Sequence, residues 1–241
     1  MPNGFQAGTT AHPRGFRAPA SLRAVALAGL FLLTGPAAAS GSAAHAALDP
    51  PERLALQRCG VDAAEFDRLL ALDQAAFDQD FDGGWRAVAS GEGCRLAAAT
   101  LIEAYLLHSR PSPPPSPLLL RWHAGQMLAM AGQVERSLAY FEGAYERGDD
   151  PDTVAWNLYV EGTLAFLRRD RDALVAAREA LAAQPVSEEE KAARRQFLED
   201  NPRIRMPEGF IDKPQNLDVL ERLLACFDGP YEQAYGGQCG N

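Results

Sequence analysis

Four cysteines are the residues of this chain whose chemistry depends most on the compartment in which the protein resides. They are Cys59, Cys94, Cys226 and Cys239, an even number that allows two disulfides in three connectivities under oxidising conditions. We favour Cys59–Cys94 and Cys226–Cys239, because each pair brackets a segment near one end of the chain, where a bridge would hold a terminus in place. The alternative is a zinc site, but the sequence has no C-x-x-C pair and few histidines.

His123 is the candidate for acid–base chemistry. An imidazole can act as a general base when a carboxylate orients it, so a carboxylate pair with His123 would support a cell-envelope hydrolase. No G-x-S-x-G, H-E-x-x-H or P-loop motif occurs, and no G-x-G-x-x-G follows a strand pattern. We therefore expect a non-enzymatic protein without cofactor or metal and keep the hydrolase as the alternative.

Two groups of aspartates have the oxygen-rich composition of a calcium loop. Asp78, Asp80 and Asp82 alternate ahead of two glycines, and a second group surrounds Pro151. Neither group has the ligand spacing and closing glutamate of an EF-hand loop. We interpret the second group as a turn in which Asp152 caps the following helix.

Residues 1–46 have the pattern of an export signal. Three arginines precede an uninterrupted apolar run at residues 24–33, and small residues at 37–39 and 44–46 give two candidate cleavage sites, near 39 and 46. The apolar run is shorter than a bilayer span, so we expect cleavage rather than a retained anchor, and no later stretch is long and apolar enough to span a membrane.

The chain beyond residue 46 is strongly acidic. It contains 20 Lys and Arg against 32 Asp and Glu, a net charge of −12. Such a charge repels phosphate backbones, and no basic stripe offsets it, so we expect no nucleic-acid partner.

The elements that would position these residues are helical. From Asp62 onward apolar residues recur at intervals of three and four, and no alternating run indicates a strand pair. Glycines and prolines interrupt the pattern at distances suited to eight to ten helices. The pattern predicts an all-α protein.

Small and aromatic residues recur within these helices. Around Gly132, which we interpret as a turn, Gly125 lies seven residues before, Phe141 nine after and Ala144 twelve after. Small residues allow two helices to approach closely, while the aromatic residue fills the groove between them. The unit resembles a tetratricopeptide repeat, which implies a solenoid of antiparallel helix pairs.

Two weaker copies flank this unit. The upstream copy turns at Gly93 and has Trp85 in its first helix, whereas the downstream copy has Gly162 in its first helix and turns at Arg168-Arg169. Three units are the usual minimum for a stable stack, and an irregular helical bundle is the alternative.

The sequence therefore divides into three parts. Residues 1–46 are expected to be a signal, residues 47–184 TPR-like helical repeats, and residues 185–241 a C-terminal helical cap with a cysteine-bracketed tail. Ser187 and the three glutamates that follow it open a charged helix in this cap.

Two segments, CFDGPYEQAYGGQC at residues 226–239 and WNLYVEGTLAFLRRD at residues 156–170, are similar to segments of a family of exported bacterial proteins. The resemblance implies export and brings no activity with it.

We expect a periplasmic or secreted scaffold that holds a peptide or protein partner. The repeat resemblance implies a concave face formed by the first helices, where amide and aromatic side chains would grip the partner. The candidate contacts are Trp122, Gln126, Trp156, Asn157 and Tyr159. The alternative is that the aromatic members pack in the core, as aromatic residues at helical spacing often do.

Overall fold

The computed structural model describes residues 40–108, 116–206 and 209–239. Within these ranges every regular element is helical and none is a strand, which confirms the predicted all-α class. The described part contains 12 α-helices and one π-helical turn, more than the eight to ten expected. Several are short, such as α4 with 6 residues and α12 with 5, and such helices contain too few apolar positions to reveal a period.

The N-terminal half of the described structure has its own core. Its elements are α1 (Ser40–Ala47), α2 (Pro50–Arg58), α3 (Ala63–Leu70), the π-helical turn η1 (Ala75–Gln79), α4 (Gly84–Ala89) and α5 (Arg95–Leu107). The largest fully buried side chains of this core include Phe66, Phe77, Trp85 and Tyr105. The rings of Phe77 and Tyr105 stack with their centroids 3.8 Å apart, which holds η1 against α5.

Helix α6 (Pro117–Met130) lies between the two halves. Leu120 and Leu128 belong to the N-terminal core, whereas Trp122 belongs to the C-terminal one. A helix with cores on two sides must be apolar around most of its circumference, which is why its sequence shows little amphipathic pattern.

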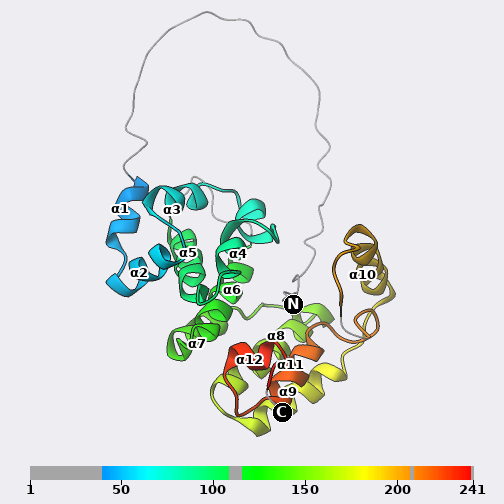
Figure 1. Ribbon diagram of the computed structural model, residues 1–241. Coiled ribbons are helices and arrows are strands. Elements are labelled where there is room, and N and C mark those ends of the chain that lie inside the picture. Colours follow the sequence, from blue (N-terminus) through cyan, green and yellow to red (C-terminus); the bar gives the residue numbers. More distant parts are fainter. Residues whose placement is uncertain (1–39, 109–115, 207–208, 240–241) are drawn as a thin grey trace, which may run out of the picture.

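The C-terminal half contains two helix pairs and the helices that cover them. The pairs are α6 with α7 (Val134–Glu142) and α8 (Pro151–Leu167) with α9 (Arg171–Ala182), and the covering helices are α11 (Leu217–Ala225) and α12 (Tyr231–Tyr235). Figure 1 shows α11 beside the α8–α9 pair, and α12 packs on α11 and α6.

Three short connections between helices contain a residue with left-handed backbone. Gly93, Gly132 and Arg169 have φ values of 71°, 74° and 60° and lie at the turns that the sequence predicted. After Gly132 and after Arg169, the next amide donates to the carbonyl five residues back, at 2.8 and 2.9 Å. This bond is typical of a Schellman motif, so the two turns close their helices in the same way.

Glycines lie where helices approach each other most closely. A β-carbon on Gly125 would stand 3.0 Å from the ring of Phe141, which places Gly125 at the predicted crossing of α6 with α7. A β-carbon on Gly162 would stand 2.6 Å from Leu220 of α11. The second glycine therefore makes room for a C-terminal helix rather than for its paired helix α9.

Helix α10 (Glu188–Asp200) begins where the sequence predicted, with the Ser187 hydroxyl accepting a first-turn amide at 3.1 Å. Figure 1 shows that α10 lies to one side of the helix pairs. The Arg194 guanidinium donates to the carbonyls of Phe210 and Lys213 at 2.7 and 2.6 Å and thereby ties α10 to the following loop. The helix that covers the α8–α9 pair is α11.

Both favoured disulfides are present, Cys59–Cys94 and Cys226–Cys239, and the described part of the chain contains no free cysteine. The first joins the end of α2 to the start of α5, and the second closes the segment that contains α12.

The expected signal falls largely outside the described residues, including its apolar run and the cleavage site at 37–39. The second cleavage site, at residues 44–46, lies within α1. Among the helices that the structure describes, none combines the length and apolar character needed to traverse a bilayer.

Candidate functional site

The five residues expected to contact a partner lie on α6 and α8. Trp122, Gln126 and Tyr159 are buried, with exposed fractions of 3%, 4% and 2%. The Trp122 ring packs against those of Trp156 and Tyr159 at centroid distances of 5.0 and 4.6 Å, so these aromatics join the two helices. Their assignment to a partner contact stays a prediction.

Trp156 and Asn157 are half-buried and hold the loop between α7 and α8. Trp156 Nε1 donates to the carbonyl of Ala144 at 2.7 Å. The Asn157 side chain accepts from the backbone N–H of Glu146 at 2.9 Å and donates to its carbonyl at 3.0 Å. The Asn157 side chain therefore hydrogen-bonds to the backbone of its own chain. Both neighbours of Tyr145 are fixed by these bonds, and the Tyr145 side chain is left 39% exposed.

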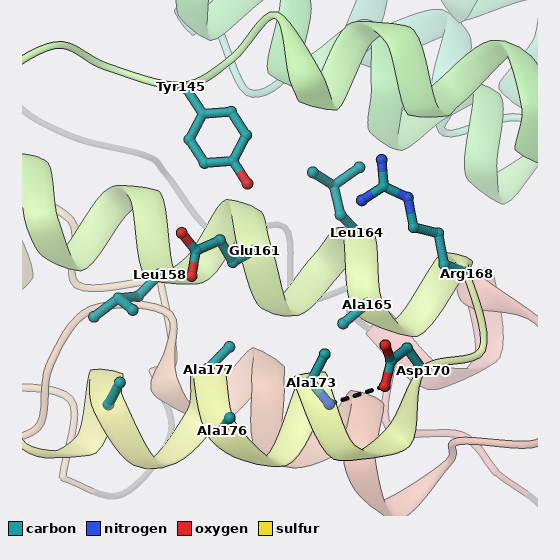
Figure 2. A pocket seen from close by; sticks show the side chains of 11 residues that line it. Tyr145, Leu158, Glu161, Leu164, Ala165, Arg168, Asp170, Ala173, Ala176 and Ala177 are labelled. Atoms are coloured by element: carbon teal, nitrogen blue, oxygen red, sulfur yellow. Dashed lines mark hydrogen bonds between the residues drawn. The ribbon is translucent and has the colours of Figure 1, made fainter.

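Tyr145 overhangs an open groove of about 450 Å³ that runs along α8 and α9 (Figure 2). Alanines form much of its lining, namely Ala165 of α8 and Ala173, Ala176, Ala177 and Ala180 of α9. Leu158 and Leu164 add apolar surface from α8. Helix α11 packs on another face of the same pair, where Leu220 lies against Gly162.

Charged side chains are spaced along this groove. Arg168 pairs with Glu142, and the Asp170 carboxylate accepts the Ala173 amide at 3.0 Å as the N-cap of α9. Partial burial, together with the charge of Glu161, raises the pKa of Tyr145. The groove therefore offers an apolar floor with polar groups at its rim.

The loop that carries Tyr145 ends at a helix cap. Asp150 accepts the Thr153 amide at 3.0 Å, so Asp150 is the N-cap of α8 and the expectation that Asp152 caps it was wrong. The physical reason is that Pro151 takes the first helical position, where a missing N–H costs nothing, which places the cap one residue earlier.

A second polar cluster lies inside the N-terminal half and contains His123. Its Nδ1 lies 2.7 Å from Oδ1 of Asp78, which also accepts from Trp85 Nε1 at 2.8 Å. Gln79 Nε2 donates to the other carboxylate oxygen at 2.6 Å, and Arg86 Nε donates to the Asp78 carbonyl at 2.7 Å. The cluster links η1, α4 and α6 across a sequence separation of 45 residues.

The electrostatics of this cluster favour an ionised carboxylate beside a neutral imidazole. Burial opposes ionisation of Asp78, but His123, Trp85 and Arg86 outweigh it and lower its pKa to about 2. Burial lowers the pKa of His123, although the Asp78 charge opposes this shift. Asp78 and His123 are 0% and 3% exposed, so a substrate has no direct access to either in this conformation.

A carboxylate pair also occurs, but it meets an arginine rather than His123. Arg136 donates to Glu52 at 2.9 Å and to Glu103 at 2.8 Å. Burial raises the pKa of Glu103, and the positive charge of Arg136 acts against this shift. This network joins α2, α5 and α7 and is an ion-paired connection between helices.

The aspartates that alternate near η1 have separate roles. Asp78 is buried among protein donors, whereas Asp80 accepts the backbone amide of Asp82 at 3.0 Å. Over the described ranges, no three His, Cys, Asp or Glu side chains converge as metal ligands.

No protein-family model matches the sequence, and neither the curated proteins nor the solved structures include a match.

Proposed function

We propose that this protein is a non-enzymatic binding module of the cell envelope that holds a segment of a peptide or protein partner in the α8–α9 groove. The observation that carries the proposal is the placement of Tyr145. Hydrogen bonds from Trp156 and Asn157 fix both of its neighbours, and its half-exposed ring overhangs an apolar floor. Exposed aromatic side chains held in a fixed conformation are typical anchors of protein interfaces, because little entropy is lost on binding.

The same proposal includes a tetratricopeptide-like solenoid as the scaffold. The equivalent turns at Gly132 and Arg169, which close their helices with the same hydrogen bond, support a repeated unit. In this arrangement α11 acts as the cap, because it covers the last helix pair, and α12 packs on α11 and α6.

We place the protein in the periplasm or outside the cell. The two disulfides support this location, since disulfides persist in oxidising compartments. The export pattern in residues 1–46 agrees with it.

The hydrolase alternative has one specific observation in its favour, the 2.7 Å contact between His123 and Asp78. A base oriented by a carboxylate is a recurring catalytic arrangement. The burial of both side chains, and the use of Asp78 as an acceptor for the side chains of His123, Trp85 and Gln79, favour a structural role instead.

Site-specific photo-crosslinking tests the binding proposal. A benzophenone amino acid at Ala176, inside the groove, should give a discrete and saturable adduct in envelope extract, and Tyr145→Ala should weaken it. The matched control is the same probe at Ala182, an exposed alanine of α9 that does not line the groove. Equal labelling from the two positions would contradict a partner held in the groove.

A further inference from the structure

The chemistry of the α8–α9 groove also indicates which kind of partner segment it binds. This inference rests on the proposed function. We infer that the occupant is an amphipathic α-helix of a protein partner that places an arginine or lysine side chain between Tyr145 and Glu161.

The backbone of the groove favours a helix over an extended peptide. An extended segment needs partners for its own N–H and C=O groups, which a sheet edge supplies. The middle of α8 and of α9 uses its backbone groups within each helix, so it offers no such ladder. A helix satisfies its own backbone and requires from the groove a complementary surface for its side chains.

The floor is shaped for close approach of a helix. Ala173, Ala176 and Ala177 present small side chains along α9, and Ala165 does so on α8. Two helix axes can approach to about 8 Å only where the side chains between them are small. From Leu158 to Arg168 the lining of α8 covers ten residue steps, or about 15 Å of helix, which matches roughly three turns of a bound helix.

The rim carries an unmatched negative charge beside an aromatic ring. Arg168 is paired with Glu142, and Asp170 caps α9. Glu161 is exposed and forms no ion pair among the residues that the structure describes. Figure 2 shows the Glu161 carboxylate and the Tyr145 ring at the same part of the groove. The Glu161 charge contributes to the raised pKa of Tyr145, which agrees with their proximity.

A cation of the partner fits this place because two kinds of attraction converge there. The carboxylate of Glu161 would pair with a guanidinium or ammonium group, and the face of Tyr145 would contact the same group by a cation–π interaction. The net charge of −12 beyond residue 46 adds a long-range attraction for basic partners. An acidic helix would meet repulsion from Glu161.

Binding of designed peptides to the full chain tests this inference. The probes are stapled peptides of about 15 residues, a length at which isolated helices are marginal without a staple, with alanine and leucine on one face. A single arginine is moved through the polar positions, and a parallel set carries citrulline, which has the same shape without the charge. At one or more registers the arginine peptide should bind about fivefold more tightly than its citrulline counterpart by fluorescence anisotropy.

Three variants assign that difference to the groove. Glu161→Gln should remove most of the preference for arginine over citrulline, and Ala176→Arg should abolish binding by filling the floor. Ala182→Arg adds the same charge and bulk outside the groove and should leave binding unchanged.

Several results would overturn the inference. They are equal affinity for arginine and citrulline peptides, an arginine preference that survives Glu161→Gln, tighter binding of a non-helical peptide of the same composition, and no binding of any peptide. A discrete adduct at Ala176 together with any of these results would leave the binding proposal standing and reject the basic helix. If neither the adduct at Ala176 nor the expected peptide binding is observed, both the binding proposal and the inference of a basic helix are rejected.

Discussion

The ring of Phe141 lies 3.0 Å from the point where a β-carbon on Gly125 would stand. Gly125 is in α6, and Phe141, which is fully buried, is in α7. Any side chain at position 125 must therefore move the ring or separate the two helices, so the absence of a side chain fixes the distance between them.

Gly125→Leu should destabilise the protein by about 1–3 kcal/mol through overpacking. Helix propensity alone predicts the opposite sign, because replacing a helical glycine usually stabilises by roughly 0.5–1 kcal/mol. Urea unfolding of the purified protein measures the difference. The free energy of peptide binding in the α8–α9 groove should change less than the free energy of unfolding, since Gly125 is in another helix pair.

Gly143→Ala serves as the control, because its β-carbon would make ordinary contacts of 3.4 Å or more at an exposed position. This change should be nearly neutral. The double variant Gly125→Ala/Phe141→Leu should be less destabilised than the sum of its single changes, since the smaller side chain frees the space. Strict additivity would argue against the Gly125–Phe141 contact.

Features that depend on short sequence separations could be predicted from the sequence. The turns at Gly93, Gly132 and Arg169, the start of α10 and the crossing at Gly125 involve residues within about two helices of each other. Local propensities and packing largely determine such features. The cysteine pairing was also predicted, because each pair brackets a segment near one end of the chain, although Cys59 and Cys94 are 35 residues apart.

The groove and the buried cluster could not be predicted in this way. Asp78 belongs to a π-helical turn of 5 residues, which is too short to show a period in the sequence, and His123 contacts it from 45 residues away. Tyr145 is in a loop, where nothing in the residue types indicates that Trp156 and Asn157 would fix its neighbours. Gly162 had the expected spacing, but the helix that packs on it comes from the C-terminal part, and spacing cannot choose between partners.

Acidification should destabilise the protein in two stages. Burial keeps the pKa of His123 below its ordinary 6.5, so the unfolded chain takes up that proton first and stability begins to fall below about pH 6.5. The pKa of Asp78 is about 2 in the folded protein against an ordinary 3.8, so its contribution is complete above pH 3.8 and is lost as the pH falls toward 2. The second stage amounts to about 2 kcal/mol and is measurable by urea unfolding across pH 2–8.

His123→Asn separates the two stages. The Asn amide can donate to Asp78 from near the Nδ1 position and does not titrate, so the loss that belongs to His123 should disappear. The lower stage should shrink but not vanish, because the His123 charge no longer lowers the pKa of Asp78 while Trp85 and Arg86 still do. An unchanged slope between pH 5 and 6.5 in this variant would assign the upper stage to other groups.

The two disulfides should differ in what they contribute to stability. Replacing Cys59 and Cys94 by serine opens a loop with a sequence separation of 35 and should cost about 4 kcal/mol, whereas replacing Cys226 and Cys239 opens one of 13 and should cost about 3 kcal/mol. Thermal unfolding of the two double variants measures the difference. A larger loss for the shorter loop would show that packing of Tyr231 against Phe141 and Phe166 outweighs chain entropy. A thiol count on denatured, unreduced protein should give no free cysteine.

Signal cleavage should leave Ser40 rather than Ala47 at the N-terminus of the exported protein. Helix α1 packs on α3, and the His45 ring lies 5.3 Å from that of Phe66, which is fully buried. Cleavage after residue 46 would remove most of this helix and its cover over Phe66. Intact mass measurement of the exported protein distinguishes the two termini, and a start at residue 47 would contradict the prediction.

Arg169 combines an unfavourable backbone with favourable side-chain contacts. Its φ of 60° is costly for any residue with a β-carbon, but its guanidinium donates to the carbonyls of Phe227 and Gly229 and lies 5.1 Å from the Phe166 ring centroid. Arg169→Ala and Arg169→Gly both remove the guanidinium. Only the alanine variant keeps a β-carbon and therefore the backbone strain of a positive φ.

The glycine variant of Arg169 should therefore be more stable than the alanine variant by about 1 kcal/mol in urea unfolding. Gly132→Ala supplies the matched comparison at the equivalent turn, where no atom lies within 4 Å of the added β-carbon, and it should cost a similar amount. If alanine and glycine at position 169 were equally stable while Gly132→Ala was destabilising, the two turns would not share a backbone conformation. The proposed repeat would then lose its main structural support, because the left-handed turn residue is the feature that both helix pairs have in common.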